Sequence, residues 1–169
     1  MIFFCIWRAV VFSDIESVVF SGIEWSSVLS VIDCVVSISG IECSVLFSGV
    51  GFVVFSCAEC IVLFSCVEYV VLFSGMEFVV VFSCVECIAL FSCVENVVLL
   101  SGMMFVVVFS SSCIECAVIV SCFEYAVVCT DIECVEFFSG IKCTVVFSVI
   151  NCVMAFSGSK RNGLNLSLV

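Results

Sequence analysis

The sequence predicts an all-β protein, either a nonapeptide-repeat β-solenoid or a stack of short hairpins. Two observations favour this fold. From Ser13 to Phe156 the chain divides into sixteen tandem nine-residue units, three of them altered in length, and each unit ends in a β-branched and aromatic run of the kind enriched in strands. A period of nine would turn an α-helix through about 900° per unit, so equivalent residues would fall on opposite faces and no helical apolar stripe would form.

The repeat unit reads Ser, Gly or Cys, Ile or Val, Glu, Cys or an aromatic residue, then three mostly aliphatic residues and Phe, as in Ser74 to Phe82. Because nine is odd, uninterrupted strand alternation would send equivalent residues to opposite faces. Equivalent residues stack only if every unit contains a corner, which we expect at Ser-Gly or Ser-Cys. The third, fifth, seventh and ninth positions are then expected to face inward.

A longer period is superimposed on the nine-residue one. The three units of Ser56 to Phe82 recur almost unchanged in Ser83 to Phe109, which gives a super-repeat of three units. Solenoid coils of two units or of three units are both compatible with the repeats. A coil of three units would place each cysteine of the first copy over its duplicate: Cys57 over Cys84 and Cys60 over Cys87.

The two flanks differ from the repeats. Residues 1–12 form an apolar head that contains Arg8, and residues 157–169 form a polar tail. The apolar run from Met1 to Trp7 is too short for the hydrophobic region of a signal peptide, and its basic residue follows it instead of preceding it. We recognise no signal peptide.

Transmembrane α-helical segments are the alternative to the β fold. Asn96 to Ile114 is an acid-free apolar stretch just long enough to span a bilayer, and Cys143 to Ser159 has basic flanks. Elsewhere most windows of this length contain two glutamates, whose insertion cost roughly cancels the gain from the apolar residues. The composition therefore predicts a membrane location for one or two segments.

Composition also excludes several classes of function. Four basic residues stand against fifteen acidic ones, for a net charge of −11, so no nucleic-acid partner is expected. The chain has no His, which excludes His-dependent triads and His metal ligands. We predict that the protein is not an enzyme, and we assign no catalytic, cofactor-binding or metal-binding residue, no cofactor and no small-molecule substrate.

The acidic residues lie almost entirely at the fourth position of the repeat. This column is expected to keep the protein soluble, with cation binding as the alternative. Because the repeat makes these carboxylates equivalent, they do not form the unlike pair that acid/base catalysis needs. Replacing five of them by Gln is expected to drive the protein into β-rich aggregates at neutral pH. These five are Glu59, Glu68, Glu77, Glu86 and Glu95. The full column comprises Glu16, Glu24, Asp33, Glu42, Glu59, Glu68, Glu77, Glu86, Glu95, Glu115, Glu124 and Glu133, with Gly51, Met104, Lys142 and Asn151 in the units that depart from it.

Sixteen cysteines occupy mainly the second and fifth positions. Three pairs have CxxC spacing, and each is followed by a further cysteine: Cys57, Cys60 and Cys66; Cys84, Cys87 and Cys93; Cys113, Cys116 and Cys122. In strand-like apolar runs, cysteine acts as a small apolar residue. We therefore expect weak, non-stoichiometric zinc uptake.

Together these features favour a non-catalytic hydrophobic repeat protein that is membrane-associated or self-assembling. Its expected partners are further copies of itself or a lipid membrane. Two alternatives remain: a Cys/Glu metal-binding array, and the spurious translation of a tandem-repeat DNA without selected function.

Overall fold

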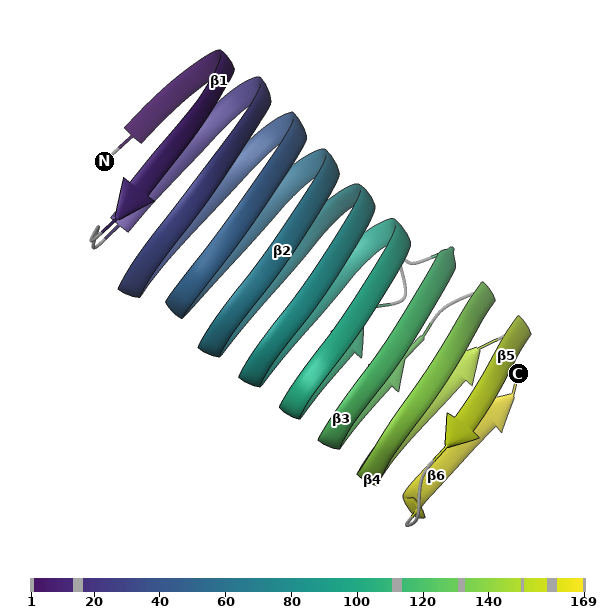
Figure 1. The fold of residues 1–169 in the computed structure, drawn as a ribbon. Helices are drawn as coiled ribbons and strands as arrows, with labels where there is room; N and C mark the ends of the chain where they lie inside the picture. Colours follow the sequence, from purple (N-terminus) through teal and green to yellow (C-terminus); the bar gives the residue numbers. More distant parts are fainter. Residues whose placement is uncertain are drawn as a thin grey trace.

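The computed structural model describes residues 2–13, 17–110, 114–130, 133–149, 151–157 and 161–168. These residues wind into a β-solenoid of about seven turns, as predicted (Figure 1). One strand, β2, contains most of the coils, and shorter strands complete the two ends. The strands are β1 (Ile2–Ser13), β2 (Ser17–Phe109), β3 (Glu115–Cys129), β4 (Glu133–Val149), β5 (Asn151–Ser157) and β6 (Arg161–Leu168).

Each coil contains two repeat units. In the pairing of β3 with β4, Glu115 lies beside Glu133, and Cys116 lies beside Cys134, which is a shift of two units. All the pairings between labelled strands are parallel, so the fold is a solenoid and not a stack of hairpins. The coil of three units is wrong, because Cys57 approaches Gly75, two units further along the chain, and not the unit of Cys84.

The described residues of both segments considered as transmembrane helices lie almost entirely in strands instead. Residues 96–109 belong to β2, and residues 143–149 and 151–157 belong to β4 and β5. Within the described part of the chain, no helix has the length and hydrophobicity needed to cross a bilayer.

The interior is formed by the second, fifth, seventh and ninth positions of the repeat. In the unit from Ser56 to Phe64, Cys57, Cys60, Val62 and Phe64 are all buried. The expectation that the third position faces inward is wrong. Residues at that position are among the more exposed apolar side chains: Val67 at 53 %, Met76 at 58 % and Val85 at 41 %.

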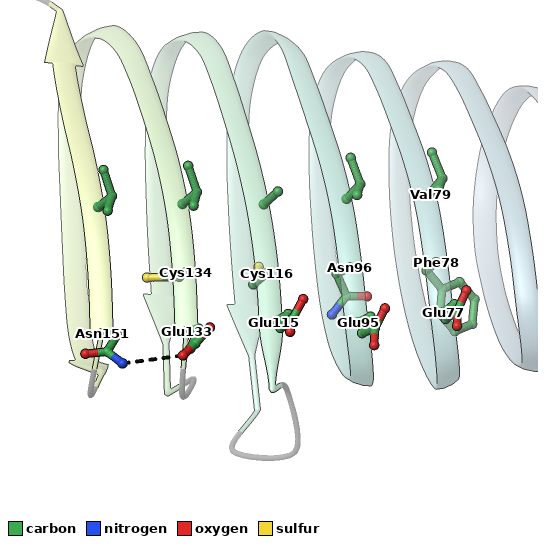
Figure 2. A pocket seen from close by; sticks show the side chains of 14 residues that line it. Glu77, Phe78, Val79, Glu95, Asn96, Glu115, Cys116, Glu133, Cys134 and Asn151 are labelled. Atoms are coloured by element: carbon green, nitrogen blue, oxygen red, sulfur yellow. Dashed lines mark hydrogen bonds between the residues drawn. The ribbon is translucent and has the colours of Figure 1, made fainter.

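The odd period is absorbed by two neighbouring residues that both point outward. Met76 and Glu77, at the third and fourth positions, are both exposed, whereas Phe78 returns to the interior. The corner is therefore two residues later than Ser-Gly. Figure 2 shows the fourth-position side chains near the end of each coil, where the ribbon bends. A convex bend with two outward residues restores the alternation before the next strand, so that every unit has the same orientation.

Stacked phenylalanines fill the centre of the coils. The ninth-position ring of Phe73 lies between Phe55 and Phe91, with centroids 5.0 and 4.7 Å away and nearly parallel planes. A second stack on the opposite wall contains Phe64 and Phe82, whose centroids are 4.7 Å apart. The two stacks meet edge to face, an arrangement favoured by the ring quadrupoles, and they hold successive coils in register.

Candidate metal centre and acidic columns

The two units of each coil place the fourth-position acids in two columns, one at each edge of the solenoid. One column contains a glutamate in every coil from Glu24 to Glu133, and we call it the long acidic column. The other, the broken acidic column, contains Gly51, Met104 and Lys142 among its members. Glu16 lies outside the described residues. The long column consists of Glu24, Glu42, Glu59, Glu77, Glu95, Glu115 and Glu133; the acids of the broken column are Asp33, Glu68, Glu86 and Glu124.

An open groove of about 610 Å³ runs beside the long acidic column. Its outer wall carries Glu77, Glu95, Glu115 and Glu133, which face the same direction in Figure 2. Asn151 ends the row, and its Nδ2 donates a hydrogen bond to Oε1 of Glu133 at 3.4 Å. Neighbouring strands lie about 4.8 Å apart, so the groove presents an equally spaced row of carboxylates.

The broken acidic column contains an ion pair. Lys142 lies directly beside Glu124 in the β3–β4 pairing, and its Nζ donates to Oε1 of that carboxylate. Both side chains are well exposed, so the pair adds little stability. Its effect is to interrupt the repulsion between successive carboxylates along this edge.

Three cysteine thiols meet inside the corner that carries the long acidic column. The Sγ atoms of Cys43, Cys57 and Cys60 all lie within 4.8 Å of one another. Cys43 Sγ and Cys57 Sγ are 2.8 Å apart, and all three side chains are buried. Second and fifth positions both point inward on either side of the bend, so a CxxC pair directs its two thiols into the same corner, where the preceding coil supplies the third.

The three thiols influence one another's ionisation. Hydrogen bonds from Cys43 and Cys60 lower the pKa of Cys57, and backbone groups of Ser56 and Gly40 act in the same direction. The hydrogen bond to Cys57 raises the pKa of Cys43, and the pKa of Cys60 is raised by its hydrogen bonds to both neighbours and by burial. The pKa of the Cys57 thiol is thus shifted in the opposite direction to those of its two neighbours.

Cys66, which follows the Cys57–Cys60 pair in the sequence, does not join it in space. Cys66 belongs to the next unit and lies at the opposite edge of the solenoid, where its thiol hydrogen-bonds to Cys84. Cys84 also hydrogen-bonds to Cys87, and these two contacts lower the pKa of Cys84. Here too a thiol meets its neighbour from the adjacent coil, two units away in the sequence.

The remaining cysteines named in the sequence are separated in the same way. Cys116 and Cys122 are buried in β3 on successive units, and Sγ of Cys122 donates to the carbonyl of Leu100 at 3.8 Å. Cys93 is buried in β2. Cys113 lies outside the described residues.

One acidic side chain is inside the solenoid. Glu136 occupies a seventh position, is 2 % exposed, and accepts a hydrogen bond from the Cys129 thiol at 3.1 Å from Oε1. Val118 and Met154 are its neighbours in the adjacent coils. A carboxyl group in this apolar column lowers the stability of the fold, because the charged form loses its hydration.

Sequence reasoning missed Cys43, because its unit contains no CxxC pair. The coil length is the signal that identifies it. Cys43 lies one coil before Cys60, and this coil is one residue shorter than two full units because the intervening unit from Ser48 to Phe55 lacks one.

No protein-family model, curated protein sequence or solved structure matches this chain. Its function must therefore be argued from its own surfaces and side-chain clusters.

Proposed function

We propose that this protein is a non-catalytic structural repeat protein that associates with further copies of itself through the flat outer faces of the solenoid. The proposal rests on the exposure of aliphatic side chains at the sixth position: Ile61 at 54 %, Val79 at 41 %, Val97 at 44 % and Val135 at 60 %. Parallel sheets in proteins are almost always covered on both faces. Here the inner face packs on the phenylalanine stacks, and the outer face presents an apolar column to solvent.

A second copy fits this face better than an unrelated surface does. Every coil presents an outward residue at the sixth position and another at the eighth, with coils about 4.8 Å apart. Two such faces therefore have matching spacings and can interdigitate as aliphatic ladders. The sixth and eighth positions contain no charged residue in any unit of the sequence. The carboxylates lie at the corners, so two faces can meet without bringing acidic columns into contact.

The non-catalytic part of the proposal rests on the equivalence of the acidic groups. The groove beside the long acidic column repeats a glutamate in four successive coils, each two residues before an aliphatic sixth-position residue. Acid/base catalysis needs two groups whose environments move their pKa values apart. A row of equivalent carboxylates suits solvation of an edge better than it suits proton transfer.

Lysine on the apolar face tests the proposal. In the double variant Ile61→Lys and Val97→Lys, the new charges lie two coils apart and next to fourth-position glutamates, so the solenoid itself is little disturbed. Self-association, measured by sedimentation velocity at neutral pH, should decrease at least tenfold, because a desolvated lysine is unfavourable in an apolar interface.

The matched control places the same charges outside the aliphatic columns. Val67→Lys and Met103→Lys change two exposed third positions at the bend, also two coils apart. This control should associate as strongly as the parent. Equal association of the face variant and the parent would contradict the proposal, as would a monomeric parent that co-sediments with phosphatidylcholine vesicles through the same face.

A further inference from the structure

The three-thiol corner has a chemistry that the apolar faces do not use. Cys43, Cys57 and Cys60 are 5 %, 3 % and 4 % exposed, and their sulfur atoms converge on one point inside the coil. Below them, the ring of Phe78 is buried in the next coil, and Gly75 brings its backbone close to the carbonyl of Cys57. The three sulfur atoms therefore lie in the buried interior of the corner, one coil away from an aromatic ring.

We propose that Cys43, Cys57 and Cys60 bind one Cu(I) ion through three thiolate sulfurs. Thiolates are soft ligands that select Cu(I) and other thiophilic d¹⁰ ions. Three sulfurs around an ion at a metal–sulfur bond length of about 2.3 Å lie about 4 Å apart. The three Sγ atoms already lie within 4.8 Å of one another, and binding separates those of Cys43 and Cys57 from their present 2.8 Å. The glutamates of the same corner point outward, so no hard oxygen ligand from a carboxylate competes inside.

The number of ligands distinguishes Cu(I) from zinc. Structural zinc sites are almost always four-coordinate, with Cys and His ligands. The chain contains no His, and within the described residues no fourth Cys, Asp or Glu joins the three thiols. Cu(I) accepts three sulfur ligands in a plane without a fourth. The weak zinc uptake expected from the sequence is compatible with this site.

The proton balance of binding is simple. Copper enters and remains as Cu(I), so no electron is transferred. Each thiol that coordinates the ion releases its proton to solvent. Hydrogen bonds from backbone groups of Ser56 and Gly40 to the sulfur of Cys57 stabilise negative charge at the centre of the cluster.

The opposite edge of the solenoid provides an internal comparison. Cys84 and Cys87 repeat the CxxC pair of Cys57 and Cys60, but the residue one coil above Cys87 is Tyr69, where Cys43 lies above Cys60. Tyr69 is 3 % exposed, and its ring packs beside those of Phe47 and Phe64. Cys66, Cys84 and Cys87 hydrogen-bond as a chain and do not converge as the first three do.

The test is an anaerobic titration of the reduced full chain with Cu(I), supplied as its acetonitrile complex. A chromogenic Cu(I) chelator in excess keeps weakly binding thiols empty. We expect one equivalent of Cu(I) per chain, with three sulfur neighbours by X-ray absorption. Cys43→Ser should weaken binding at least 100-fold. Cys122→Ser, a buried second-position cysteine whose thiol also hydrogen-bonds to a backbone carbonyl, should bind as the parent does.

A gain-of-function variant keeps the test independent of folding defects. Tyr69→Cys places a thiol one coil above Cys87, as Cys43 lies above Cys60, and a second equivalent of Cu(I) should bind. Far-UV circular dichroism checks that each variant retains the β fold. Three results would overturn the proposal: unchanged copper affinity in Cys43→Ser, zinc binding more tightly than Cu(I) at the same cluster, or a Cys43–Cys57 disulfide that persists under the reducing conditions of the titration.

Discussion

Glycine at the second position and an aromatic residue at the fifth position pack together inside the bend. Where the fifth position holds Phe78, the second holds Gly75, and Phe105 is matched by Gly102 in the same way. A Cβ added to Gly75 would lie 1.7 Å from the carbonyl oxygen of Cys57 and 2.8 Å from Cε2 of Phe78. The variation between Gly and Cys in the repeat is therefore partly a matter of volume inside the corner.

Gly75→Ala should lower the free energy of unfolding by about 1 to 3 kcal/mol, because the coil must shift to relieve these contacts. Gly140→Ala is a graded comparison, since its Cβ would lie 2.6 Å from the carbonyl oxygen of Cys122. Urea unfolding followed by circular dichroism measures both. A larger loss in Gly140→Ala than in Gly75→Ala would contradict this account.

Glu136 is the residue at which the repeat pattern and the interior conflict. Val118 occupies the same position one coil earlier. Glu136→Val should increase the free energy of unfolding by about 1 to 4 kcal/mol, because the substitution replaces a buried carboxyl group with an apolar side chain. Glu133→Val, at an exposed fourth position, should give no such increase. If urea midpoints show equal changes in both variants, burial of Glu136 is not the cause.

Within each strand, the inward orientation of the seventh and ninth positions was predictable from the sequence. Val62, Phe64, Val71 and Phe73 face inward as the β-branched and aromatic run indicates. The third position was assigned to the wrong side, because the bend lies at the third and fourth positions and not at Ser-Gly or Ser-Cys. The sequence pattern determines which residues of one strand share a face. The position of the bend, where the alternation starts again, depends on backbone geometry at the corner.

Phenylalanines account for nearly all of the largest fully buried side chains among the described residues. Phe73 stacks on Phe55 and Phe91 and also meets Phe64 and Phe82 edge to face. Phe73→Ala should therefore cost about 3 to 5 kcal/mol in the free energy of unfolding.

The neighbouring Leu72 points to the outer side of the same strand and gives a control. Leu72→Ala should cost less than about 1 kcal/mol, since that side chain retains solvent contact in the folded monomer. Chemical denaturation of dilute monomer compares the two. Similar losses would show that the interior stacks do not dominate stability.

Buried thiols and phenols make the stability of the whole molecule depend on pH. Burial raises the pKa of Cys34 and Cys122, that of Cys122 to about 12, and also raises the pKa of Tyr69 and Tyr125. Such groups keep their protons in the fold after the unfolded chain has lost its own near pH 8.5 for Cys and 10 for Tyr. Their contribution to stability is therefore present below these values and is lost as the pH rises.

Raising the pH from 7.5 to 10.5 under reducing conditions should lower the free energy of unfolding by about 2 kcal/mol or more. The lowered pKa values of Cys57 and Cys84 act in the opposite sense, but the groups with raised values are more numerous. Thermal unfolding at a series of pH values measures the effect. A melting temperature that is constant or rises over this range would contradict it.

The solenoid class was predictable from the period of nine, but the coil length and the thiol cluster were not. Coils of two units and of three units satisfy the same repeat, and the choice depends on how many bends close a coil around two phenylalanine stacks. The cluster follows from the coil length, since Cys43 meets Cys60 across one turn of the chain. Contacts between turns are invisible to any search that looks for ligands at close sequence spacing.

Two units per coil also constrain how such a gene can lengthen. Replication slippage that adds two units inserts a full turn and leaves every later side chain at its original edge. Slippage that adds one or three units exchanges the edges for all residues downstream. The near-identical segments Ser56 to Phe82 and Ser83 to Phe109 are offset along the chain by three units. Each residue of the second copy therefore lies at the opposite edge from its duplicate. Tract-length variants of this chain should therefore fall into two classes, those of even and those of odd change, with different neighbours around every cysteine.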